Sequence, residues 1–239
     1  MKRIIIMALG VLMALALATP MALAGVGQGA NAADTPEELA ALWTQWAFSK
    51  PVDVDSPLIG SYEGGPRCDG TPLSPTQGNT WFLSGTFDSS KVVRTCTMPA
   101  DTQLFFPVVN WIAFPFFPKE TPKNQRQAAI NAMNATLNDP KLRMSVTVDG
   151  NEVNSNQIVR AISPAYFSVT MPEENAFDPF VNPNPPGLRA GVYEGWTTDG
   201  LWVTLPPLPP GEHEIRFEMN APNAFGGISQ DNTYILTVG

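Results

Sequence analysis

The fold is decided by one central stretch of sequence, WFLSGTFDSSKVVRTCTMPADTQLFFPVVNWIAFPFF (Trp81–Phe117). It holds three apolar runs separated by turn residues, together with one of the two cysteines and the densest group of aromatic residues. Runs of this length bounded by Asp, Ser and Pro are typical of β-strands. We therefore predict strands at about 80–87, 91–97 and 103–112.

Two details of this stretch bear on how its strands pack. Val92, Arg94 and Cys96 fall on one face of the second predicted strand, because successive side chains of a strand point to opposite faces. Pro107 has no backbone N–H to donate, so we expect the third strand to lie at the edge of a sheet or to be bulged at this residue.

Helices are predicted on both sides of the central stretch, at about 35–48 and 122–138. Each begins with a threonine in the N-cap position and a proline in the first helical position. The first carries large apolar residues at helical spacing, so we expect it to pack as a lid on a sheet. In the second, Ile130, Met133 and Leu137 form a narrow apolar stripe.

Beyond residue 141 only β patterns follow, with Asp149-Gly150 and Asp199-Gly200 as two-residue turn signals. The further predicted strands lie at about 144–148, 157–162, 165–171, 192–197, 201–205, 211–219 and 233–238. This series of strands without βαβ alternation predicts a mainly β fold, an antiparallel β-sandwich of jelly-roll or immunoglobulin-like type with two attached short α-helices. We place it in a single domain over residues 35–239.

The N-terminus has the pattern of an export signal. A charged start, an apolar run and a small-residue triplet predict a signal peptide over residues 1–24, with an alternative cleavage site after residue 32. The other interpretation is an uncleaved membrane anchor, which the short run and Pro20 disfavour. Residues 25–34 are expected to be flexible, and no later segment is long enough to span a membrane. We expect a secreted protein, extracellular or periplasmic.

The chain has two cysteines, Cys68 and Cys96. In an oxidising compartment they predict one disulfide bond, and the alternative is a pair of free or metal-binding thiols. Two thiols and one histidine are too few for a zinc site of the usual kind, so we expect no metal and no cofactor.

Charge and motifs exclude several functions. The formal net charge is −8 and no cluster of Lys and Arg occurs, which argues against nucleic acid as a partner. No glycine-rich phosphate loop is present. His213, the single histidine, falls on the apolar side of a predicted strand, so we interpret it as structural and assign no catalytic residue.

Aromatic residues in two proline-rich segments are the candidate ligand contacts. Exposed rings on the loops of a sandwich could stack on sugar rings or insert into a groove of a partner. The alternative, which we favour, is that the rings close one end of the sandwich as a small additional core. The residues concerned are Trp111, Phe114, Phe116, Phe117, Phe177 and Phe180.

These observations favour a non-enzymatic binding or structural module over an enzyme. Its expected partners are a glycan, an envelope component or another protein. The alternative is a secreted carbohydrate-active hydrolase, because glycoside hydrolysis needs only two carboxylates flanking a sugar. Acids in or near predicted loops are Glu63, Glu173, Glu174, Asp178, Glu194 and Asp199.

Three motifs carry a resemblance: W-F-L-x-G from Trp81, R-x-C-x-x-P from Arg94 and F-F-P-V-x-N from Phe105. In this order they resemble a group of uncharacterised secreted prokaryotic proteins, and the tryptophan-bearing first helix fits the same pattern. The segment Leu208–Ile215 is similar to the closing hairpins of many extracellular sandwich domains. The resemblance implies secretion and a β-sandwich, and it brings no activity and no ligand residues.

Overall fold

The computed structural model describes residues 34–52, 56–59, 79–87, 89–116, 119–177 and 189–239. The predicted signal peptide, its alternative cleavage site and Cys68 lie outside these residues, so the disulfide bond stays a prediction. In the described part of the chain, no helix is both long and apolar enough to cross a membrane.

The two helices begin where the sequence predicts them. Helix α1 spans Pro36–Phe48 and starts with a capping box. In this box the Thr35 hydroxyl accepts a hydrogen bond from the Glu38 amide, and the Glu38 carboxylate accepts one from the Thr35 amide at 2.9 Å. Helix α2 spans Pro122–Leu137, with Thr121 as its N-cap.

The buried face of α2 differs from the predicted stripe. Met133 is buried as expected, whereas Ile130 and Leu137 are only half-buried. The remainder of the buried face consists of small residues, Ala129, Ala132 and Thr136. Small side chains allow α2 to lie close to the sheet, and the sequence pattern of large apolar residues could not indicate this.

Ten strands are assigned in the described residues, and they form two five-stranded sheets. The inner sheet has the order β1-β3-β8-β6, with β7 also paired to β8, and the outer sheet has the order β2-β10-β9-β4-β5. The strands are β1 (Thr80–Phe82), β2 (Val92–Met98), β3 (Gln103–Ala113), β4 (Arg143–Val148), β5 (Asn151–Glu152), β6 (Ile158–Ile162), β7 (Phe167–Met171), β8 (Gly191–Leu205), β9 (Gly211–Ala221) and β10 (Ile228–Val238).

The prediction of a β-sandwich is confirmed, but the sheets are mixed rather than purely antiparallel. Strand β1 pairs with β3 in parallel, and β2 pairs with β10 in parallel. Parallel neighbours need a long connection between them. Here β1 reaches β3 by way of β2 in the other sheet, and β2 reaches β10 by way of all the strands from β3 to β9.

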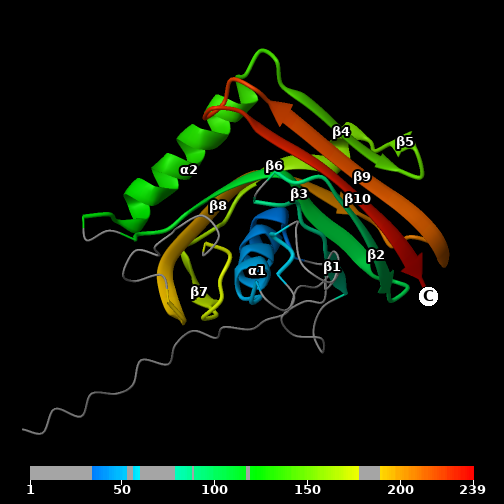
Figure 1. Ribbon diagram of the computed structural model, residues 1–239, viewed down its shortest axis with the longest axis horizontal. Coiled ribbons are helices and arrows are strands. Elements are labelled where there is room, and N and C mark those ends of the chain that lie inside the picture. Colours follow the sequence, from blue (N-terminus) through cyan, green and yellow to red (C-terminus); the bar gives the residue numbers. More distant parts are fainter. Residues whose placement is uncertain (1–33, 53–55, 60–78, 88, 117–118, 178–188) are drawn as a thin grey trace, which may run out of the picture.

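The molecule has three layers, and the inner sheet is the middle one (Figure 1). Its first face packs on the outer sheet, where Leu104 and Phe106 belong to the core that also contains Cys96. Its second face packs on α1, where Phe105 and Trp202 belong to a second core with Trp43. Because both faces are covered, the first part of β3 is buried without alternation and reads as a continuous apolar run, Leu104–Val109. The buried and exposed residues of β2 alternate instead, which fits a sheet covered on one face only.

Strand β8 contradicts one prediction. The sequence predicts a turn at Asp199-Gly200 between two strands, whereas one strand runs without interruption through both residues. The carboxylate of Asp199 is fully buried and accepts two hydrogen bonds from Arg160, at 3.0 and 2.6 Å. Gly200 leaves room for Asn110 on the neighbouring β3, whose Cβ lies 2.7 Å from the position that a Cβ on Gly200 would occupy. The burial of Asp199 and the close approach at Gly200 both depend on residues of strands that are distant in sequence.

Two other backbone predictions are confirmed. The pairing of β3 with β8 shifts register between Pro107 and Val109, which is the bulge expected at the proline. Asp149 and Gly150 link β4 to β5 with φ values of 51° and 76°, as a two-residue type I′ turn requires.

Candidate functional site

A cavity of about 460 Å³ lies where the end of β3, helix α1, the segment after β1 and the β9–β10 hairpin meet. Three of the six predicted aromatic residues line it: Trp111, Phe114 and Phe177. Phe116 does not line it, and Phe117 and Phe180 lie outside the described residues. The lining consists of Trp43, Phe48, Leu58, Ser84, Gly85, Thr86, Phe87, Ser89, Pro107, Val108, Val109, Asn110, Trp111, Ile112, Ala113, Phe114, Gln125, Phe177, Met219, Ile228, Ser229 and Gln230.

Trp111 is a fixed, half-buried wall of this cavity. Its Nε1 donates a hydrogen bond of 2.9 Å to the Thr136 hydroxyl, which in turn donates to the Ala132 carbonyl in α2. The Phe225 ring lies against the Trp111 ring at a centroid distance of 4.7 Å. These contacts hold the indole in one orientation.

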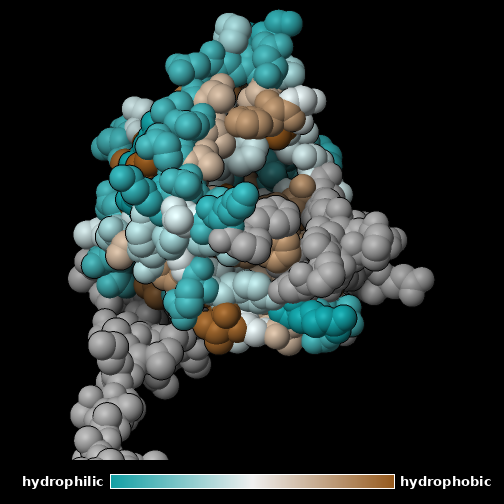
Figure 2. Space-filling view, turned by 90° about the vertical axis from the view of Figure 1, so that its left-hand side faces the viewer, coloured by the Kyte–Doolittle hydropathy of each residue, from teal (hydrophilic) through white to brown (hydrophobic). Residues whose placement is uncertain are grey.

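Phe114 and Phe177 belong to a continuous group of rings. Phe114 stacks on the fully buried Trp196, with 4.1 Å between ring centroids and 3° between planes. Phe177 lies 5.9 Å from Phe114 and stacks on Phe48 of α1 at 5.6 Å. The rings are therefore packed on one another and on the second core, and they border the cavity with part of their surface. The described part of the face seen in Figure 2 is mostly hydrophilic, and its apolar side chains show as separate small patches.

The polar side of the cavity is formed by residues 84–86 and Gln230. The Gln230 carboxamide bridges the Thr86 backbone, accepting from its N–H at 3.0 Å and donating to its C=O at 2.7 Å. The Ser84 hydroxyl donates to the Gly85 carbonyl, and the Thr86 hydroxyl donates to the Ser90 carbonyl. Most of these polar groups are thus satisfied within the protein.

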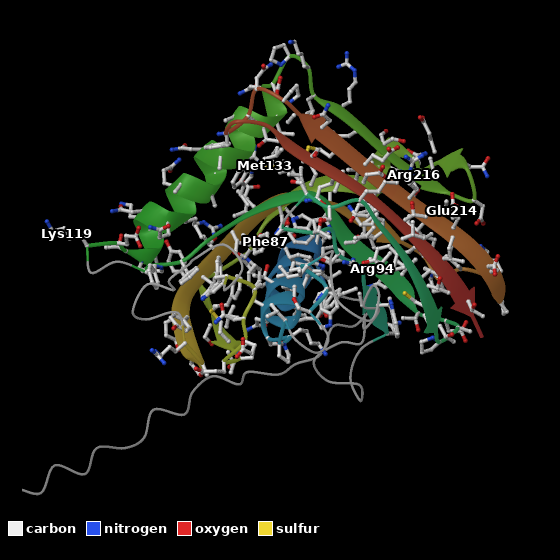
Figure 3. All side chains as sticks on the ribbon, in the orientation of Figure 1. Phe87, Arg94, Lys119, Met133, Glu214 and Arg216 are labelled. Atoms are coloured by element: carbon white, nitrogen blue, oxygen red, sulfur yellow. The ribbon has the colours of Figure 1, made fainter. Side chains whose placement is uncertain are left out.

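Arg94 lies fully buried behind this polar side (Figure 3). Its guanidinium donates to the carbonyls of Ser84 and Pro57, each at 2.8 Å, and to the Tyr234 hydroxyl. Arg94 thereby holds together the two segments that contribute Leu58 and residues 84–87 to the cavity. We did not single out this residue from the sequence, although its alternation with Val92 and Cys96 placed it on the buried face.

The predicted acids do not converge on the cavity. Glu173, Glu174 and Glu194 are exposed, and Asp199 is held by Arg160, whose pKa is raised by the hydrogen bonds to this carboxylate. None of these four acids lines the cavity. Glu63 and Asp178 lie outside the described residues. Among the described residues, no group of three or more His, Cys, Asp and Glu could hold a metal ion.

His213 occupies a structural position at the turn between β4 and β5. Its Nδ1 lies 2.8 Å from the Asp149 carboxylate, and its Nε2 lies 2.9 Å from the Pro209 carbonyl. The hydrogen bond to Asp149 raises the pKa of His213, and the same bond lowers the pKa of Asp149. His213 is not part of the cavity lining.

Comparisons with known proteins add no functional information. No protein-family model matches the chain, and no curated protein matches it. One similar solved structure is the solution structure of amebosin, at 11% identity and a TM-score of 0.22, over 66% of this chain and 96% of that chain. A similarity this weak supports no conclusion about fold or function.

Proposed function

We propose that this protein is a non-enzymatic binding module whose ligand enters the cavity at the end of β3. The observation that carries the proposal is the convergence of Trp111, Phe114 and Phe177 on one half-open cavity of about 460 Å³. Cavities of this size, lined mainly by apolar and aromatic side chains with a few polar groups, are the usual form of a small-molecule site.

The chemistry of the lining favours binding over hydrolysis. A glycosidase of the usual kind needs two carboxylates facing one site. The described lining offers hydroxyl and carboxamide groups but no carboxylate and no imidazole. No observation favours the hydrolase alternative. A glycan, an envelope component or a protein partner would engage this site by inserting one group into the cavity.

We also propose that the protein is exported and carries a Cys68–Cys96 disulfide bond, on the strength of the signal-peptide pattern and the two cysteines. Cys96 is buried in the core between the sheets, so its thiol is shielded from reagents in the folded protein. The mass of the denatured, unreduced protein after treatment with an alkylating reagent therefore tests the bond. Alkylation of both cysteines without prior reduction would contradict it.

Native mass spectrometry tests the binding function. The purified protein is incubated with an extract of the culture medium and cell envelope, and bound molecules are recovered and compared with the unbound pool. We expect a one-to-one complex, with the ligand recovered chemically unchanged. Ala113→Phe, which places a ring at a small lining residue, should abolish the complex.

Two outcomes would contradict the proposal. A complex that forms equally well with Ala113→Phe would show that the ligand binds elsewhere. A ligand recovered in altered form would show that the protein is an enzyme.

A further inference from the structure

We infer that the ligand of this cavity is electrically neutral and mainly apolar, with a single small polar group at one end. A long-chain alcohol has this chemistry. The inference rests on the proposed function and deepens it by naming the ligand class. It follows from what each side of the cavity offers.

The described part of the lining offers no countercharge. Its described residues include no Asp, Glu, Lys, Arg or His. The nearby buried cation, Arg94, does not line the cavity, and its Nη atoms are engaged by Ser84, Pro57 and Tyr234. A charged ligand would therefore lose its hydration without gaining an ion pair, which strongly disfavours binding.

The described lining suits an apolar ligand better than a sugar, because most of its residues are apolar. Thr86, Gln230 and Ser84 are already paired within the protein. The side chains of Ser89, Gln125 and Ser229 have no hydrogen bond among the described residues, and the Asn110 carboxamide makes one, from its nitrogen to Thr198. These groups can satisfy a polar end group. A sugar would also bring hydroxyl groups against the apolar lining, and each one left unpaired weakens binding.

The apolar side of the cavity is rigid before any ligand binds. Phe114 is held by its stack on Trp196, and Trp111 is held by its hydrogen bond to Thr136. Phe225 lies on Trp111 with a φ of 47°, a backbone conformation that bulky residues rarely adopt, and 60% of its surface is exposed. The turn between β9 and β10 thus places the Phe225 ring against the Trp111 ring, and it does so with a strained backbone at Phe225. Walls fixed in advance lower the entropic cost of binding a flexible apolar ligand.

Displacement of a neutral fluorescent probe tests the inference. N-phenylnaphthylamine fluoresces strongly only in apolar surroundings, and we expect it to bind the full-length protein in a one-to-one ratio. Dodecanol should displace it. Dodecanoate and maltose should need concentrations at least about tenfold higher, because a tenfold difference in affinity is enough to distinguish a neutral apolar ligand from a charged one or a sugar. Ala113→Phe should weaken probe binding by about tenfold or more. Ser229→Trp, a second blocking variant at an exposed lining residue, should act in the same direction.

Tyr166→Ala is the matched control, because this exposed aromatic residue does not line the cavity. It should leave the affinity unchanged. Displacement by maltose or dodecanoate in preference to dodecanol would overturn the inference. A ligand found by native mass spectrometry that is polar or charged, and is lost in Ala113→Phe, would overturn the ligand class and leave the proposed function standing. Failure of both the probe and the extract to bind would overturn both.

Discussion

Gly200 is the residue on which the pairing of β3 with β8 depends most directly. A Cβ at this position would lie 2.7 Å from Asn110 Cβ and 2.8 Å from the Val109 carbonyl oxygen. The carbonyl belongs to the backbone of a central strand and cannot move aside without breaking the ladder. We therefore expect Gly200→Ala to lower the free energy of unfolding by about 1–3 kcal/mol. Urea unfolding followed by tryptophan fluorescence measures this.

Gly191, in the same strand, provides a matched control. A Cβ there would have its nearest neighbour at 3.9 Å, an ordinary contact distance. Gly191→Ala should change stability by less than about 0.5 kcal/mol. Equal effects of the two substitutions would show that close approach at Gly200 is not what the strand pair requires.

The sequence could indicate some single residues and not others. Alternation along β2 places Arg94 on the buried face, yet arginine is rarely buried without an acid beside it, and its acceptors are two carbonyls and a tyrosine hydroxyl supplied by other segments. At Gly200, by contrast, the local sequence pattern is misleading. After an aspartate it is a strong local turn signal, and only the presence of Asn110 on the neighbouring strand explains why it stands inside a strand.

Among the elements, the turn between β4 and β5 has its own dependence on pH. Both ring nitrogens of His213 face acceptors, the Asp149 carboxylate and the Pro209 carbonyl. Only the doubly protonated ring can donate to both. The hydrogen bond between the ring and the carboxylate therefore raises the pKa of His213 above its ordinary value of 6.5 and lowers the pKa of Asp149 below its ordinary value of 3.8.

The stabilisation of this turn should be confined to a pH window. The contribution of His213 is fully present below its unfolded-state pKa of 6.5 and is lost as the pH rises through the higher folded-state pKa. The contribution of Asp149 is present above 3.8 and is lost as the pH falls through the lower folded-state pKa. Because His213 is the only histidine, a single imidazole NMR signal reports its titration.

We expect this imidazole signal to titrate with a midpoint above 6.5, and Asp149→Asn to move the midpoint down. Wild type should lose stability relative to His213→Gln, which lacks the titrating group, as the pH rises from 6.5 through the folded-state pKa of His213. A midpoint at or below the ordinary histidine value would refute the role assigned to the Asp149 bond.

The elements also show which features a local sequence pattern can predict and which it cannot. Both helices begin with local capping residues, and the patterns predicted these starts correctly. The predicted break in β8 is wrong because the burial of Asp199 depends on Arg160, 39 residues away. The candidate aromatic residues show a similar limit. Their density was visible in the sequence, but the stack of Phe114 on Trp196 and the cavity beside it depend on contacts between distant strands.

At the scale of the whole molecule, strand β3 of the central stretch lies in the middle of three layers. Phe105 and Phe106 are neighbours in β3, are both fully buried and belong to different cores. Phe105 packs 5.1 Å from Trp202 in the core beneath α1, and Phe106 packs 4.8 Å from Phe217 of the outer sheet. A sandwich of two layers would leave one of these rings facing solvent.

Substitution of these neighbours one at a time tests the three-layer architecture. Phe105→Leu and Phe106→Leu should each lower the free energy of unfolding by about 1–3 kcal/mol, because each shrinks a ring in a closely packed core. Equilibrium unfolding of the two variants and of Tyr166→Leu, at an exposed aromatic residue, measures this, and the third should be nearly neutral. If Phe105→Leu were as neutral as Tyr166→Leu while Phe106→Leu remained costly, α1 would not form a core with the inner sheet in solution.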